Sequence, residues 1–311
     1  MAEKSAKKPQ PLQVAFQGAP GAFSHRAGQI FTEQNGLGDD AKYVPCRSFD
    51  EVFESVLDYR CALGVIPLEN TSIGSIVANF DLLYKYPVMM VGEIYIPIHH
   101  QLIGFEGTPL KSLTAVFSHP AALDQCKVFL KSLPAAKPQT YWDTSGAALH
   151  VSASSNRKFA AIASEFAAKE ANLAILKRDI EDHAGNSTRF GIIVPSLDHK
   201  NTESKRKPDP RVAPLVEATG KKYPLKLSCV AELAHTPGTL ANLLNGLIET
   251  HTNLTKIESR PVPDAQWHYR FFLDMVIDSA DKDKQVVDAI QKRTEMVKLL
   301  GRYQIWEPGM S

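Results

Sequence analysis

Apolar residues in the C-terminal part of the chain recur with the spacing of a helix face. Leu240, Leu243, Leu244, Leu247 and Ile248 fall at i, i+3, i+4, i+7 and i+8, so they predict one buried side of a helix. Around it, the pattern predicts strands over Leu225–Leu233, Leu254–Val262, His268–Ile277 and Leu299–Trp306, and a second helix over Lys282–Lys298. The order β-α-β-β-α-β is typical of a ferredoxin-like sandwich, in which two helices cover one sheet face and the other face or an edge stays free for pairing.

The first part of the chain alternates short apolar runs with amphipathic segments. Strands are predicted over Leu12–Gln17, Ala62–Pro67, Leu113–Ser118, Phe159–Ala161 and Leu173–Leu176. Helices are predicted over Phe23–Gln34, Asp50–Tyr59, Ser72–Tyr84, Ala121–Leu130, Thr144–Val151 and Ser164–Glu170. This alternation predicts a mainly parallel α/β sheet, with ligands bound near the carboxyl ends of the strands.

A polar stretch rich in charge and proline separates the two patterns at Ser196–Pro224. It cannot easily bury a core, so it indicates a linker, although a long loop inside one domain is the alternative. We therefore predict a disordered tail over residues 1–11, a first domain over 12–196, a linker over 197–224 and a second domain over 225–307.

Composition and charge exclude several classes of function. The 311 residues include 35 Lys+Arg and 34 Asp+Glu, so no general positive field exists to hold nucleic acid or an anionic membrane. No apolar run is long enough to span a bilayer. The four cysteines are far apart in the sequence and form no CxxC pair, which favours free thiols in a reducing, cytoplasmic setting.

A glycine turn, Gly18–Gly21, stands between a predicted strand and a predicted helix. Backbone N–H groups in such a turn can face an anion, and Ser24 near the helix start can donate a hydrogen bond. The turn lacks the order GxGxxG and no Gly-Lys-Ser/Thr follows it, so dinucleotide and P-loop sites are poorly supported. A purely structural turn is the alternative.

Polar residues also follow other predicted strands. Asn70 and Thr71 come after the apolar run Ile66–Leu68, Ser118 and His119 end another strand, and Asp143 precedes a predicted helix. These side chains could cap helices or bind an anion.

The polar segment Gly185–Gly191 contains Thr188 and Arg189. An arginine among Asn, Ser and Thr suits bidentate recognition of a small carboxylate, with a solvated surface turn as the alternative. No nucleophile with an evident base and no metal-ligand spacing occurs, so the residues suit binding of an oxyanion-rich molecule with mild proton transfer.

Seven of these segments, taken together and in order, resemble the prephenate dehydratase family: GAPGAFS at 18–24, IPLENTSIGS at 66–75, SHPAALDQC at 118–126, DTSGAA at 143–148, NSTRF at 186–190, PGTLANLL at 237–244 and NLTKIESRP at 253–261. The resemblance implies an α/β fold with a two-lobed, periplasmic-binding-protein-like catalytic domain followed by a ferredoxin-like ACT domain. It implies no cofactor and no metal.

For the catalytic domain, the resemblance implies decarboxylating dehydration of prephenate to phenylpyruvate in phenylalanine biosynthesis. Thr188 matches the catalytic threonine, expected to donate a hydrogen bond to the departing hydroxyl, and Arg189 is the expected carboxylate-side cation. The remaining substrate-binding positions implied by the motifs are Ser24, Asn70, Thr71, Ser118 and Phe190, with Phe190 expected to pack beneath Arg189. Thr71 replaces a usual serine and keeps the hydroxyl, whereas Ala121 replaces a usual glutamine.

For the ACT domain, the resemblance implies feedback regulation by L-phenylalanine bound between two such domains, and hence a homodimer or homotetramer. The implied positions are Gly238, Thr239, Leu240, Asn253, Glu258, Ser259 and Arg260. Thr239 is bulkier and more polar than the usual alanine, which could change affinity or ligand choice.

Two other functions remain open at this point. Arogenate dehydratase performs the same elimination on the amino-acid analogue of prephenate, and a non-catalytic two-lobed protein could bind or sense an amino acid. Residues 1–11 leave no room for a fused chorismate mutase domain, so we expect a monofunctional, cytoplasmic protein.

Overall fold

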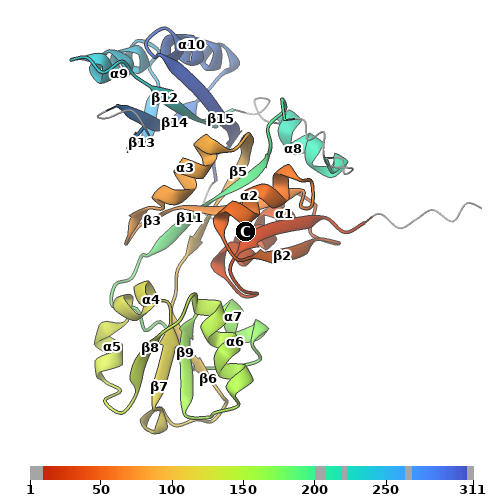
Figure 1. Ribbon diagram of the computed structural model, residues 1–311, viewed down its shortest axis with the longest axis vertical. Coiled ribbons are helices and arrows are strands. Elements are labelled where there is room, and N and C mark those ends of the chain that lie inside the picture. The colour runs from red at the N-terminus through yellow and green to blue at the C-terminus, as the bar shows by residue number, and fades with distance from the viewer. Residues whose placement is uncertain (1–9, 200–207, 219–222, 263–267, 307–311) are drawn as a thin grey trace, which may run out of the picture.

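Two β-sheets organise the chain in the computed structural model, which describes residues 10–199, 208–218, 223–262 and 268–306. A ten-stranded sheet runs through the C-terminal part and the first part of the chain, and a five-stranded sheet forms a separate body. Figure 1 shows the five-stranded body at one end, the C-terminal part at the other and the beginning of the chain between them. Residues 1–9 of the predicted tail lie outside the described residues.

The middle body, which we call lobe I, holds six of the ten strands of the large sheet. Its strands are β1 (Gln13–Gln17), β2 (Lys42–Cys46), β3 (Leu63–Asn70), β4 (Gly74–Ser75), β5 (Val88–Pro97) and β11 (Ser187–Pro195), and its helices are α1 (Phe23–Gln34), α2 (Phe49–Leu57) and α3 (Val77–Lys85). β3 is buried over almost its whole length, as its continuous apolar run predicts. The strand continues to Asn70 and pairs with β4, so α3 begins at Val77 and not at Ser72 as predicted.

The five-stranded body, lobe II, has the order β10-β6-β9-β7-β8. Its elements are β6 (Gln101–Gly104), η1 (Leu110–Ser112), β7 (Ala115–Ser118), α4 (Pro120–Gln125), α5 (Lys127–Lys131), β8 (Lys137–Thr140), α6 (Thr144–Ser154), β9 (Phe159–Ala163), α7 (Glu165–Glu170) and β10 (Ala174–Lys177). Alanine-rich faces of α6 and β9 allow close packing of helix on sheet. The prediction of a mainly parallel sheet was wrong, because β11 runs antiparallel to both β3 and β5, and β6 antiparallel to β9 and β10.

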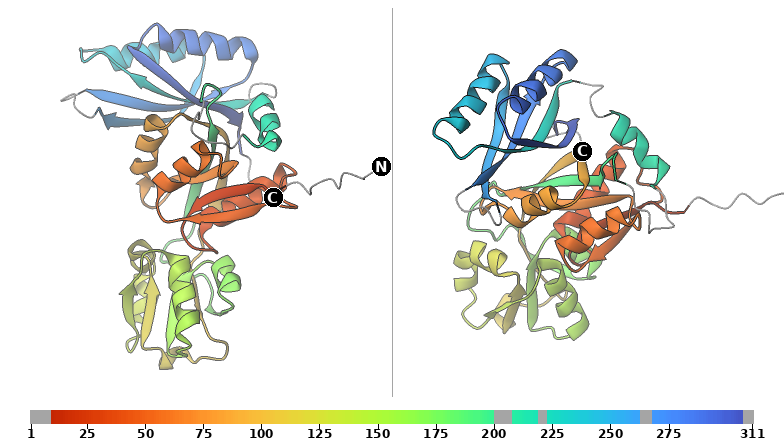
Figure 2. Two further views of the ribbon diagram at one scale, coloured as in Figure 1. Left: turned by 45° about the vertical axis from the view of Figure 1, so that its right-hand side comes forward. Right: turned by 45° about the horizontal axis from the view of Figure 1, so that its top comes forward.

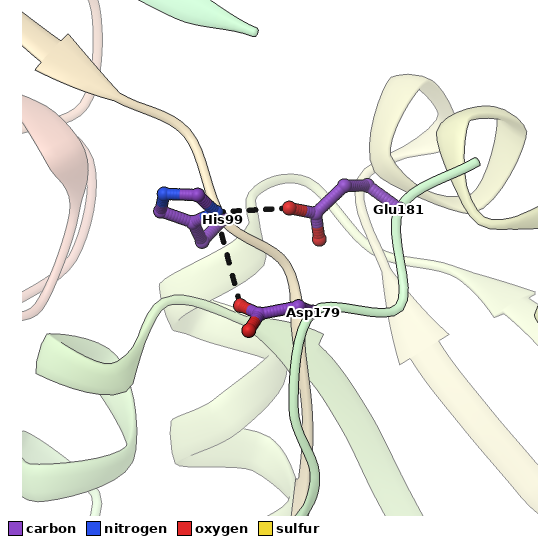
Figure 3. Close-up of side chains that lie close together, drawn as sticks. All are labelled: His99, Asp179 and Glu181. Atoms are coloured by element: carbon purple, nitrogen blue, oxygen red, sulfur yellow. Dashed lines mark hydrogen bonds and ion pairs between the residues drawn. The ribbon is translucent and has the colours of Figure 1, made fainter. Parts of the chain in front are cut away.

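Two crossing segments join the lobes and contact each other. Residues 98–100 lead from β5 into lobe II, and residues 178–186 lead back to β11. His99 Nδ1 lies 2.9 Å from Glu181 Oε1 and 3.8 Å from Asp179 Oδ1 (Figure 3). The backbone N–H of His100 donates to the other oxygen of Glu181 at 3.0 Å. These contacts tie the outgoing and returning segments into a double connection.

The C-terminal unit has the predicted order: β12 (Leu225–Glu232), α9 (Thr239–Glu249), β13 (Asn253–Pro261), β14 (Tyr269–Ile277), α10 (Ala280–Gln291) and β15 (Met296–Gln304). Four residues of the apolar face predicted for α9 pack on the sheet with α10, namely Leu240, Leu243, Leu244 and Leu247. The fifth, Ile248, is 68% exposed, so its inclusion in the buried face was wrong. Helix α10 ends earlier than predicted, and Met296–Lys298 belong to the last strand. Figure 2 shows both helices on the outer side of this sheet and lobe I on its inner side.

The inner face of the C-terminal sheet packs directly on lobe I, at an interface that we call the joint. Four of its side chains enter the core of lobe I beside α3, namely Val230, Phe272, Leu300 and Tyr303. β15 also pairs with β5 through Gly301 and Met90, which joins the C-terminal strands and the lobe I strands into the one ten-stranded sheet. The sheet face that the sequence left open is therefore covered by the chain's own first domain.

The predicted linker contains regular structure in its described residues. A short 3-10 helix (Pro210–Val212) leads into α8 (Ala213–Ala218), and Val212, Leu215 and Val216 pack against lobe I. Residues 200–207 and 219–222 of the predicted linker lie outside the described residues.

The contact at Gly301 gives a test of the joint. A Cβ at this position would lie 2.2 Å from the carbonyl oxygen of Met90, so Gly301→Ala must separate β15 from β5. We expect the free energy of unfolding to fall by roughly 2 kcal/mol, measured by urea titration. Gly38→Ala is the matched control, because its nearest contact would be an ordinary 3.4 Å. Equal stabilities of the two variants would contradict the close approach of the strands.

Candidate active site

A cleft of about 220 Å³ lies between the two lobes. Both lobes line it: Gln17, Ala22, Phe23, Ser24, Pro67, Asn70, Ile73, Ile76, Thr188 and Phe190 come from lobe I and its edges, and His119, Ala121, Ala122, Gln125, Asp143 and Thr144 from lobe II, with Ile98, His100 and Asn186 from the crossing segments. Asn70 is the last residue of β3 and Thr188 is the second residue of the antiparallel β11, so the two side chains meet at the same end of the paired strands.

The orientation of the Asn70 amide is fixed by backbone groups. Its Oδ1 accepts from the backbone N–H groups of Ser72 at 2.9 Å and Ile73 at 3.1 Å. Because a backbone N–H can only donate, this atom must be the oxygen. The Asn70 Nδ2 therefore donates, to Thr188 Oγ1 at 2.9 Å and to Asn186 Oδ1 at 2.7 Å.

This orientation leaves the Thr188 hydroxyl proton free. Thr188 Oγ1 accepts from Asn70, and within the described part of the chain no acceptor takes its proton. The side chain is buried, so water competes weakly for that proton. Thr188 is thus oriented to donate a hydrogen bond into the cleft.

The same polarity continues toward the second lobe. Asn186 must donate with its Nδ2, to Gln125 Oε1 at 3.4 Å, and His100 Nε2 lies 2.7 Å from the same oxygen. Nε2 therefore carries the proton of the neutral imidazole. His100 Nδ1 is buried and has no partner among the described residues. Burial lowers the pKa of His100, so Nδ1 is a bare acceptor at neutral pH.

Hydrogen-bond donors for an anion come from the glycine turn. Helix α1 begins at Phe23, and no side chain caps its first turn. Ser24 lines the cleft, and its hydroxyl has no hydrogen-bond partner in the described ranges. Helix α6 also starts at the cleft, but there Asp143 accepts from Gly146 N and, across the lobes, from Ala19 N at 3.0 Å. Burial raises the pKa of Asp143.

Of the expected substrate-binding residues, the structure brings Ser24, Asn70, Thr188 and Phe190 to this cleft. Ser118 is fully buried and donates to the Ile162 carbonyl at 2.6 Å, away from the lining. Thr71 follows β3 and does not line this cleft; its hydroxyl accepts from Ser187 N at 2.9 Å and lies 3.4 Å from Asn186 Oδ1. Thr71 instead lines a second cavity, of about 480 Å³, at the joint.

Arg189 does not reach the cleft, so the expectation of a substrate carboxylate contact needs correction. Successive residues of a strand point to opposite faces, and Thr188 faces the cleft. Arg189 consequently faces the joint, where its guanidinium donates to Glu69, Glu93, Asp274 and Tyr303 at 2.6–2.9 Å. Among the described residues that line the cleft, none is a lysine or an arginine. The expectation that Phe190 packs beneath Arg189 was also wrong, because Phe190 lies in the lobe I core and at the cleft, on the side of the strand away from Arg189.

The expected effector positions divide between two surfaces. Gly238 caps α9 with φ +88°, and Thr239 Oγ1 donates to the Ala234 carbonyl at 3.0 Å. Asn253 and Ser259 are exposed on β13, and Leu240 is half-buried. Glu258 and Arg260 instead face lobe I, where they contact Ser75 at 2.6 Å and Asp81 at 2.9 Å.

Sequence reasoning missed His100 and Gln125 as members of the site. His100 lies in a crossing segment without a periodic pattern, and Gln125 stands inside the segment SHPAALDQC with no feature that sets it apart. An amide followed by a buried imidazole is not a recognisable spacing, because the two residues meet only through the fold.

Comparison with known proteins places these features in a family. The prephenate dehydratase family model matches residues 14–196. Arogenate dehydratase 3 from Arabidopsis thaliana is 33% identical over 96% of this chain and 70% of its own length. A second relative, arogenate dehydratase/prephenate dehydratase 6 from the same plant, is 32% identical over 96% of this chain and 71% of its own length.

Solved structures share the whole fold. A prephenate dehydratase from Arthrobacter aurescens, solved with L-Phe, has a TM-score of 0.76 over 96% of this chain and 94% of its own, at 22% identity. GqqA, described as a quorum quenching acylase, has the same TM-score over 95% of this chain and 98% of its own, at 26% identity. The fold and the cleft define a two-lobed α/β protein with a ferredoxin-like C-terminal unit. The chain belongs to the prephenate dehydratase family.

In the described residues, no helix is both long and apolar enough to cross a membrane. The cytoplasmic location stays a prediction.

The direction of the Asn70 amide can be tested by Asn70→Asp. One oxygen of the new carboxylate would still accept from the two backbone N–H groups. The other would stand where the amide nitrogen was, so it would accept the Thr188 hydroxyl proton instead of donating to the hydroxyl oxygen. We expect kcat to fall about a hundredfold at pH 8 and to recover partly as the pH falls and the carboxyl takes up a proton. The measurement is a pH profile of kcat, with Asn242→Asp, on the exposed side of α9, as control. A profile parallel to the wild type would refute the assigned polarity.

The glycine turn should make stability pH-dependent through His25. Its Nδ1 accepts from Gly21 N at 3.2 Å, and burial, aided by Arg26, lowers the pKa of His25 to about 4. The unfolded chain takes up this proton near pH 6.5, so the free energy of unfolding falls as pH drops from 6.5 to 4, by about 3 kcal/mol.

Urea titrations at pH 7 and pH 4 measure this difference. His25→Gln keeps an acceptor without the titration and should remove most of the loss, whereas His150→Gln should not. An unchanged pH dependence in His25→Gln would exclude this role.

Proposed function

We propose that this chain converts prephenate to phenylpyruvate, water and carbon dioxide. The single observation that carries the proposal is the Thr188 hydroxyl, held by Asn70 so that its proton is directed into the cleft. In the reaction the C–O bond to the ring hydroxyl breaks and the ring C–carboxylate bond breaks, and the electron pair of the latter completes the aromatic ring. The departing hydroxyl takes up one proton from solvent to become water, and the hydrogen bond from Thr188 stabilises it as it leaves.

Carboxylate recognition is assigned to the end of lobe I that faces the cleft. The uncapped first turn of α1 and the Ser24 hydroxyl can donate to one carboxylate, and the positive end of the helix dipole adds to the attraction. Such donors are neutral and preorganised, so a carboxylate can be bound in the cleft without a lysine or an arginine. Phe23, Ile73 and Phe190 offer apolar contacts for the ring.

We extend the proposal to the C-terminal unit as an ACT domain that binds L-phenylalanine and reduces activity. Its β-α-β-β-α-β order and the exposed residues Gly238, Asn253 and Ser259 support this. The related Arthrobacter structure was solved with L-Phe. β13 is the outer strand of the sheet, so a second copy could pair with it and give the homodimer or homotetramer expected.

Arogenate is the second candidate substrate, and one observation favours it. Arogenate carries an ammonium group where prephenate has a keto oxygen, and His100 Nδ1 is an unused acceptor beside the cleft. The relatives named above include arogenate dehydratases.

Side-by-side assays of prephenate and arogenate, with and without L-phenylalanine, distinguish the two candidate substrates. L-phenylalanine should lower the rate and raise the melting temperature; no change in either would contradict the regulatory part.

Thr188→Ala tests the catalytic assignment. We expect kcat to fall about a hundredfold or more, with substrate affinity changed only a few-fold, because the lost hydrogen bond forms mainly with the departing hydroxyl. Thr188→Ser keeps the hydroxyl and is the matched control, expected to retain most of the rate. Near-normal turnover by Thr188→Ala would remove the assignment, and no turnover of either substrate by the wild type would favour a sensing protein.

A further inference from the structure

We propose that Arg189 and Glu69 are positioning residues for Thr188 and Asn70, and that the C-terminal unit fixes their place through Lys256 and Asp274. The proposal rests on the catalytic role of Thr188 given above. It assigns the joint a part in the reaction, although the joint lies on the side of the sheet opposite the cleft.

Strand pairing links the two sides. In the ladder between β11 and β3, Thr188 is opposite Asn70 and Arg189 is opposite Glu69. The first pair is hydrogen-bonded in the cleft and the second is ion-paired at the joint, 2.9 Å apart. Each strand therefore carries one cleft residue and one joint residue in consecutive positions, with a single Cα–Cα step between them.

The C-terminal unit holds both joint residues by short contacts. Asp274 Oδ2 lies 2.6 Å from Arg189 Nη1, and Tyr303 Oη accepts from Arg189 Nη2 at 2.9 Å. Lys256 Nζ lies 2.6 Å from Glu69 Oε1. The Arg189 side chain is only 5% exposed, so solvent screens these pairs weakly.

Docking pairs buried charges across the joint. Lobe I contributes two carboxylates, Glu69 and Glu93, and one guanidinium, Arg189. The C-terminal unit contributes two ammonium groups, Lys226 and Lys256, and two carboxylates, Asp274 and Glu258, the latter 3.6 Å from Lys256. The side chains of Glu93, Lys226 and Asp274 are each at most 8% exposed, and leaving a buried charge unpaired is strongly unfavourable. The cluster thus resists sliding of one part on the other.

A shift of the C-terminal sheet would consequently move β11 and β3 at the positions that orient Thr188. Another contact across the joint, made by Lys298, does not involve β3 or β11. Lys298 Nζ donates to the carbonyls of Leu83, Tyr84 and Tyr86 at the end of α3, and no residue of α3 lines the cleft. Lys256 is therefore coupled directly to a cleft strand through Glu69, whereas Lys298 is not.

This difference provides the experiment. Lys256→Met and Lys298→Met each remove one lysine of the joint from the full-length protein. With the substrate that the wild type turns over faster, Lys256→Met should lower kcat by about tenfold or more and leave KM within about twofold, because misplacement of Thr188 affects the chemical step. Lys298→Met should retain the wild-type kcat. Urea titrations confirm that both variants are folded under assay conditions.

A conservative replacement separates positioning from general damage. Lys256→Arg keeps the charge beside Glu69 and should recover most of kcat, and Glu69→Gln should lower kcat as Lys256→Met does. A wild-type kcat in Lys256→Met, or an equal loss in Lys298→Met, would overturn the proposal. Thr188→Ala and Thr188→Ser, assayed in the same series, report on the proposed function independently of this outcome.

Discussion

The pairing of β11 with β3 is the constraint on which the site depends. It brings Asn70 and Thr188 together on one face and Glu69 and Arg189 together on the other. A shift of β11 by one residue in this ladder would turn the Thr188 hydroxyl toward the joint and the Arg189 guanidinium toward the cleft. The surrounding core opposes such a shift, because Phe190 and Ile192 of β11 are buried on one face and Ile193 is buried on the other.

Periodic segments of the sequence were sufficient to predict many of the elements. α1 begins and ends where its pattern predicts, and the C-terminal order β-α-β-β-α-β follows from helix-spaced leucines between strand-like runs. The strands β5 and β6 were not predicted, since lobe I, lobe II and the joint all bury them and erase any alternation. The antiparallel placement of β11 depends on which strands it meets after lobe II, and local pattern does not carry that information.

The sequence indicated several residues of the candidate site but not how they are arranged in space. Thr188 and Asn70 reach the cleft as expected, whereas Arg189 does not, because the segment that holds it is a strand and not the polar turn that its composition suggested. In a turn, neighbouring side chains can share one face; in a strand they cannot. The hydrogen-bond direction through Asn70, Asn186 and Gln125 originates at two backbone N–H groups, so only coordinates could reveal it.

The double connection between the lobes limits how the cleft can open. β5 and β11 remain paired up to Pro97 and Ser187, directly before the chain crosses into lobe II. Two adjacent, mutually bonded segments bend together about one axis but resist twisting and sliding. Lobe II should therefore rotate as one body about the two crossing segments. The hydrogen bond from Ala19 N to Asp143 helps to hold the closed form. Opening must break the contacts between the lobes at the glycine turn, from Ala19 N to Asp143 and from Ser164 Oγ to the Gly21 carbonyl at 3.3 Å, while Thr188 in lobe I keeps its orientation.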